Sequence, residues 1–153
     1  MTSKWVRIVA AQRDYTVDWR FISLRLINSG IDYDSHFLAG YEEGHASGLW
    51  LLRVAARARA EHGRAAVGSF YETVSSETRC RRADARRQGQ PRLRRAVAGP
   101  GGTACRLADA LGDTRWDEEI RAEGDAALVR TGRDVGTPII HFSPRKARPY
   151  SAR

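Results

Sequence analysis

The stretch from Arg79 to Arg106 limits most strongly what this chain can fold into. It contains nine arginines and one aspartate, and its only sizeable aliphatic residues are Leu93 and Val97. A segment with so few apolar side chains cannot bury enough surface to offset the entropy that it loses on ordering. We therefore predict that residues 79–106 are disordered and that the fold is built from the residues on either side.

The same segment carries the whole basic excess of the chain. The net charge of the 153 residues is +8, and outside residues 79–106 the basic and acidic residues balance. Such a run of arginines predicts a steeply salt-dependent attraction to polyanions. However, no aromatic residue lies between Arg79 and Arg106 for base stacking, and no recognised nucleic-acid motif is present. A non-enzymatic, Arg-rich protein that binds nucleic acid or another polyanion is the alternative interpretation.

Before this segment the sequence predicts a helix and then a strand. Residues 3–13 have helical spacing. Residues 16–24 alternate between apolar and polar side chains, with Val17, Trp19 and Phe21 on one face. That alternation is typical of a half-buried strand. A helix followed closely by a strand favours the α/β class.

The next part of the sequence has a helical pattern. Residues 35–62 predict a helix in two pieces joined near residues 40–44, and Gly63 is placed to end it. The pattern resumes over residues 65–74 with apolar side chains on one face. We expect a helical subdomain over residues 31–78.

After the arginine-rich segment the sequence predicts a helix and a strand. Asp113 or Thr114 is expected to cap the helix, and Gly132 to end it. Residues 135–142 then form a short apolar, β-branched run with Pro138 near its start. Proline has no N–H and a fixed φ, so it suits the first residue of a strand. An X-Pro bond at such an entrance is also a position where a cis peptide occurs.

Three blocks of the chain resemble the DsbA-like branch of the thioredoxin-fold oxidoreductases, especially the actinobacterial mycothiol-dependent nitroreductase type. They are residues 2–6 with 17–24, residues 52–56 with 61–63, and residues 134–141. The resemblance implies a partial thioredoxin-like α/β domain with a helical insertion subdomain. The implied boundaries are an incomplete thioredoxin-like domain over 1–26 and 107–142, the insertion over 31–78, the arginine-rich segment over 79–106 and a disordered tail over 143–153.

The resemblance also implies a function. Members of the family carry out thiol-disulfide exchange or thiol-dependent reduction with a low-pKa cysteine in a Cys-Pro-x-Cys-like motif. Their cis-proline loop binds the thiol substrate through its backbone. By resemblance Gly136, Thr137 and Pro138 are the substrate-binding residues, and a low-molecular-weight thiol such as mycothiol is the cosubstrate. No other cofactor and no metal are implied.

The redox motif of the family is missing from this sequence. Cys80 and Cys105 are its only cysteines, and they do not form a Cys-x-x-Cys. We assign no catalytic residue and expect the chain to be inactive as given. The expectation is a truncated member, disrupted in the middle and at the C-terminus, in which Met1 is an internal methionine of a longer reading frame.

Cellular location and assembly follow from simpler arguments. No run approaches the length of apolar sequence that a membrane span requires, and charged residues lie in the first seven positions. We therefore expect a cytoplasmic protein without a membrane partner. A sheet that lacks a strand exposes an edge, and such an edge favours a homodimer.

Overall fold

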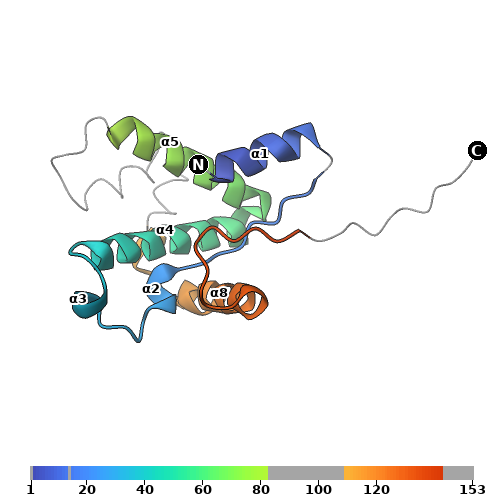
Figure 1. Cartoon of the computed structure of the whole chain (residues 1–153). Helices are drawn as coiled ribbons and strands as arrows, with labels where there is room; N and C mark the ends of the chain where they lie inside the picture. Colours follow the sequence, from blue (N-terminus) through green and yellow to red (C-terminus); the bar gives the residue numbers. More distant parts are fainter. Residues whose placement is uncertain (1, 14, 83–108, 143–153) are drawn as a thin grey trace, which may run out of the picture.

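The computed structural model describes residues 2–13, 15–82 and 109–142 (Figure 1). All the regular secondary structure in these ranges is helical. In chain order the elements are α1 (Thr2–Gln12), α2 (Leu24–Ile27), α3 (Tyr33–His36), α4 (Tyr41–His62), α5 (Ala65–Arg82), η1 (Asp109–Gly112), η2 (Thr114–Trp116) and α8 (Asp117–Thr131).

Helix α4 is the centre of the fold. It packs against α5, α2, η1, η2 and α8, and Figure 1 shows α1 and α5 on one side of it and α8 on the other. The predicted break in the helical stretch is confirmed, because α3 and α4 are separated at Gly40, whose φ of 87° is left-handed.

The core is made by the apolar face of α4 and the segments that cross it. One cluster joins Phe21 from the segment before α2 to Ile120 of α8, and Trp19 and Trp116 pack against it. A second cluster joins Val54 of α4 to η1. Trp50 packs against the second cluster, whereas Trp5 on α1 is 52% exposed. Three of the four tryptophans are therefore core anchors, and Trp5 is not.

The predicted α/β class is wrong for the part of the chain that the structure describes. Neither residues 16–24 nor residues 135–142 form a strand there. A strand needs a neighbour to complete its backbone hydrogen bonds, and no strand lies beside either run within the described ranges. The alternation at residues 16–21 is nevertheless visible in the burial, since Thr16, Asp18 and Arg20 are exposed and the residues between them are not.

The predicted helix ends are confirmed. Gly63 and Gly132 follow α4 and α8 with φ of 81° and 82°, and their N–H groups donate to the Arg59 and Leu128 carbonyls, each at 2.8 Å. The Asp113 side chain accepts from the Arg115 N–H at the start of η2. Asp117, Glu118 and Glu119 occupy the first turn of α8, where the helix dipole favours acidic groups.

Several predictions fall on residues outside the described ranges. Helix α5 includes the first four residues of the arginine-rich segment. Residues 83–106 and the tail at 143–153 lie outside the described residues. Their predicted disorder, and the domain boundaries drawn from it, stay predictions.

Candidate functional site

The loop after α8 contains the three residues to which the family resemblance assigns substrate binding. The chain leaves α8 at Gly132 and continues without regular structure to Phe142. Gly136, Thr137 and Pro138 are all exposed, and the Thr137–Pro138 peptide bond is cis. A Cβ placed on Gly136 would meet no other atom within 4 Å. The loop therefore presents its backbone openly on the surface.

The backbone groups of this loop are free to bind a ligand within the described structure. No hydrogen bond joins residues 133–142 to any other described residue. Proline has no N–H, so Gly136 and Thr137 supply the donors of the motif and all three residues supply carbonyl acceptors. An extended polar molecule can be bound by such groups in the manner of strand addition.

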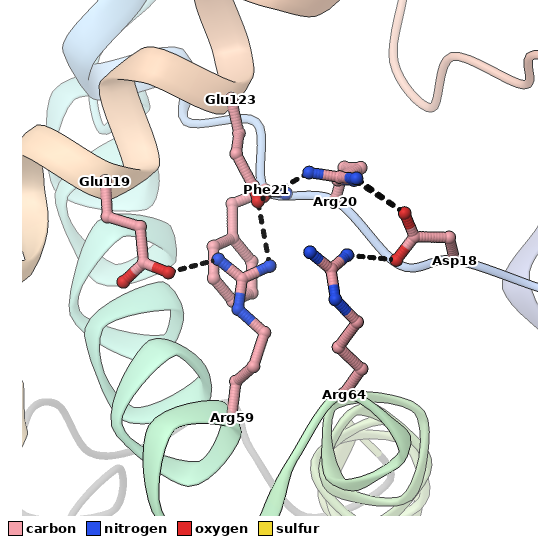
Figure 2. A network of polar contacts seen from close by, with 7 residues as sticks. All are labelled: Asp18, Arg20, Phe21, Arg59, Arg64, Glu119 and Glu123. Carbon is pink, nitrogen blue, oxygen red and sulfur yellow. Dashed lines mark hydrogen bonds and ion pairs between the residues drawn. The ribbon is translucent and has the colours of Figure 1, made fainter.

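Helix α8, which leads into the loop, is held by a network of charged side chains shown in Figure 2. Glu123 of α8 lies at its centre and is 13% exposed. One carboxylate oxygen accepts the Phe21 N–H at 2.8 Å. The other lies 2.9 Å from Arg59 Nη1 and 3.2 Å from Arg20 Nη1. The contact with Arg59 is an ion pair rather than a well-directed hydrogen bond.

Arg59 of α4 connects the two sides of this network. Its guanidinium lies over the Phe21 ring, 4.0 Å from the ring centroid, and also pairs with Glu119 of α8. The side chain is 9% exposed. A cation over an aromatic face is stabilised by the ring quadrupole, the more so where water is excluded. Arg59 thus fixes the segment before α2 against both α4 and α8.

Asp18 and its partners form the outer part of the network (Figure 2). Its carboxylate accepts from Arg64 at 2.6 Å and from Arg20 Nε at 2.8 Å. Partial burial acts to raise the pKa of Asp18, but the hydrogen bonds and charges of Arg64 and Arg20 outweigh it and hold that pKa below its ordinary value. The hydrogen bond to Asp18 raises the pKa of Arg20 above its ordinary value, against partial desolvation.

A second ion pair, in which the arginine is buried, fixes the start of α8. Arg53 of α4 donates from Nε and Nη2 to the two carboxylate oxygens of Asp117, both at 2.7 Å, and from Nη1 to the Leu111 carbonyl at 3.2 Å. Arg53 is 7% exposed. The parallel pair of bonds is the geometry that a planar guanidinium and a carboxylate favour. Two arginines of α4 therefore hold the first half of α8: Arg53 binds its first residue, and Arg59 pairs with Glu119 and Glu123.

The histidines have roles that the sequence did not distinguish. His45 on α4 is surrounded by the rings of Tyr33, Phe37 and Tyr41, and its Nδ1 lies 3.0 Å from the Tyr33 hydroxyl. These four residues are spaced by four positions and come from α3, the connection that follows it and α4. This regular spacing of aromatic residues is the sequence feature from which the cluster could have been predicted. His36, His62 and His141 are exposed.

Neither cysteine can be placed in a site. Cys80 belongs to α5, but its side chain lies outside the described residues, as does all of Cys105. Within the described ranges no three metal-binding side chains come together. No helix of these ranges is long and apolar enough to cross a membrane.

A comparison with protein families decides where this chain belongs. The family model described as mycothiol-dependent nitroreductase Rv2466c, or Rv2466c-like, matches residues 1–146. The chain belongs to this family. The match includes the exposed loop at Gly136-Thr137-Pro138 and the helices that carry it. No solved structure matches the chain.

Proposed function

We propose that this chain binds a low-molecular-weight thiol such as mycothiol through the backbone of Gly136, Thr137 and Pro138, in the service of a thiol-dependent reduction. Membership of a mycothiol-dependent nitroreductase family supports the thiol as the ligand class. The observation that carries the assignment to the loop is that its backbone is exposed and forms no hydrogen bond within the described structure.

The 153 residues are proposed not to carry out the reduction by themselves. Thiol-disulfide chemistry in this type of protein needs a thiolate activated by a helix N-terminus or a nearby cation. The sequence has no Cys-x-x-Cys, and Cys80 and Cys105 lie 25 positions apart. The disruption predicted for the middle of the chain and the cytoplasmic location belong to this proposal too.

The binding part is tested by calorimetric titration of the chain with reduced mycothiol. Gly136→Val is the diagnostic variant, because its side chain has room in the fold but would cover the loop backbone. Gly30→Val is the matched control, since Gly30 also has no neighbour within 4 Å and lies in a surface turn. We expect Gly136→Val to weaken binding at least about tenfold, which is about 1.4 kcal/mol, and Gly30→Val to leave it unchanged. Equal affinity in all three proteins would contradict the loop assignment.

The catalytic part is tested by a disulfide-reduction assay with mycothiol as the electron donor. The chain as printed is expected to give no rate above the uncatalysed reaction. A rate that disappears in Cys80→Ser or Cys105→Ser would show that one of these thiols is a nucleophile after all. That result would overturn the inactivity while leaving the binding proposal in place.

Polyanion binding by residues 79–106 is the second candidate function. Its support is the concentration of the entire net charge in one segment. It predicts an affinity for DNA that falls steeply with salt and is lost when residues 79–106 are replaced by a neutral linker. An affinity that survives the replacement would exclude this segment as its cause.

A further inference from the structure

The aromatic cluster at α3 and the start of α4 (Figure 1) places a buried phenol against an imidazole. Tyr33 is 7% exposed, and its hydroxyl oxygen lies 3.0 Å from Nδ1 of His45. In the tautomer that carries its proton on Nε2, the imidazole accepts the hydroxyl hydrogen at Nδ1. The separation is within the range over which a base takes a proton directly from its hydrogen-bond partner. The pair is therefore a phenol with its own proton acceptor.

Aromatic rings connect this buried hydroxyl to the surface. The ring centroid of Phe37 is 5.0 Å from that of Tyr33, and the ring centroid of Tyr41 is 5.7 Å from that of Phe37. The Tyr41 side chain is 48% exposed. Electron transfer between aromatic side chains falls off steeply with distance and is fast between rings that are in contact. Phe37 thus bridges a buried tyrosine and an exposed one.

Two charged side chains influence how Tyr33 can lose an electron. The guanidinium of Arg25 on α2 lies over the Tyr33 ring, 5.1 Å from its centroid, and Arg25 Nη2 is 3.0 Å from a Glu42 carboxylate oxygen. A cation beside the ring disfavours a positive charge on it, so loss of an electron is favoured when the phenolic proton leaves as well. Glu42 lies three positions before His45 on the same side of α4, where its carboxylate is a counter-charge for an imidazolium.

We propose that Tyr33 is a redox-active tyrosine, which gives one electron to a small oxidising radical while His45 takes its phenolic proton. The O–H bond of Tyr33 breaks, and its proton passes to Nδ1 of the imidazole. The electron passes through Phe37 and Tyr41 to the radical at the surface, which is thereby reduced. The product is a neutral phenoxyl radical on Tyr33, hydrogen-bonded to an imidazolium.

The other exposed tyrosines of the described structure lack this arrangement. Tyr15 and Tyr71 are exposed, and neither hydroxyl has a hydrogen bond to a described residue. A phenoxyl radical on either side chain is open to collision with a second radical. Burial shields the Tyr33 ring from such collisions, so a radical held there is expected to live longer.

Pulse radiolysis of the full chain, with the azide radical as oxidant, tests the proposal through the phenoxyl absorption. No thiol is needed, so the outcome is independent of the proposed thiol binding. The wild type is expected to show a slowly decaying component. Tyr33→Phe, which removes only a hydroxyl group, is expected to lose it, and the matched control Tyr71→Phe is expected to keep it. A wild type without a slow component, or a slow component that survives in Tyr33→Phe, would overturn the proposal.

His45→Gln separates proton transfer from a structural role. The glutamine amide oxygen can accept a hydrogen bond from the Tyr33 hydroxyl, but it is too weak a base to take the proton. Since a positioned general base contributes about 10²–10⁴-fold, we expect the slow component to form at least about 100-fold more slowly in this variant. In the wild type the same step is expected to slow in D₂O. Equal rates in His45→Gln and wild type would overturn the role of the imidazole.

Tyr41→Phe tests the route to the surface. Phenylalanine is much harder to oxidise than tyrosine, so the Tyr33 radical is expected to form more slowly in this variant and to decay at the wild-type rate. An unchanged rate of formation would show that the electron leaves by another route and would overturn this part of the proposal. Thermal unfolding followed by circular dichroism verifies that each variant is folded.

Discussion

Replacing Glu123 by alanine tests the network that carries α8 and its loop. Glu123 accepts the N–H of Phe21, a residue only 2% exposed, so that water cannot take the place of the lost acceptor. A hydrogen bond to a charged group contributes about 1.5–3 kcal/mol, and a buried unpaired donor costs about 1–3 kcal/mol. Arg59 still has Glu119 as a counter-charge in this variant, so the loss of its ion pair with Glu123 costs less than leaving the Phe21 N–H without an acceptor. We expect a loss of about 3 kcal/mol in the free energy of unfolding.

The conservative variant Glu123→Gln refines this estimate. The amide oxygen can still accept the Phe21 N–H, but the attraction to Arg59 and Arg20 is removed. We expect about half the loss, about 1.5 kcal/mol. Both values are measured by urea unfolding followed by circular dichroism at neutral pH.

The matched control is Asp125→Ala, two positions further along α8. Asp125 is exposed and forms no hydrogen bond or ion pair within the described structure. Its replacement is expected to change stability by no more than about 0.5 kcal/mol. A Glu123→Ala variant as stable as Asp125→Ala would refute the reasoning, because the Phe21 N–H would then have another partner.

Four further substitutions are predicted from local geometry. Asp117→Asn leaves a buried guanidinium without its counter-charge and is expected to cost about 3 kcal/mol in urea unfolding; a loss below about 1 kcal/mol would contradict the burial. Gly48→Ala, in open space on α4, is expected to stabilise the protein by about 0.5–1 kcal/mol. Gly68→Ala on α5 is expected to destabilise it by about 1 kcal/mol or more, because the new Cβ would lie 2.9 Å from Trp19 Nε1. Equal melting temperatures for these two variants would contradict the packing of that indole. Asp18→Asn is expected to cost at most about 1 kcal/mol at pH 6, since the aspartate is partly exposed. The pKa of Asp18 is lowered in the folded state, so its contribution is present above the unfolded pKa of about 3.9 and lost as the pH falls through the folded value. The difference from wild type should therefore shrink as the pH falls below the unfolded pKa and vanish once the folded carboxyl is protonated, and a difference that stays constant on acidification would exclude the ionised carboxylate as its source.

The helices could be predicted because their signals are local. Gly63 and Gly132 mark helix ends by a left-handed conformation that other residues avoid, and Asp113 caps η2 through its own side chain. The apolar spacing along α4 identifies its buried face, although Ala60, four positions after the buried Ala56, is exposed. Such features depend on residues within one or two turns of each other.

The strands were predicted wrongly because a strand is not a local structure. The alternation over residues 16–21 is reproduced in the burial, but the segment is held by side chains of α4, α5 and α8 instead of a neighbouring strand. Glu123 and Arg59 lie 102 and 38 positions from Phe21, and nothing in the local sequence indicates their pairing. The exposed loop at residues 136–138 was found through family resemblance, and its exposure became known only from the structure.

The most direct test of the account is a titration of the ¹⁵N-labelled chain with reduced mycothiol, followed through the amide resonances. The account predicts saturable shifts for Gly136 and Thr137, while the amides of α4 stay unchanged. Shifts confined to other parts of the chain, or no saturable shift at all, would contradict thiol binding at this loop.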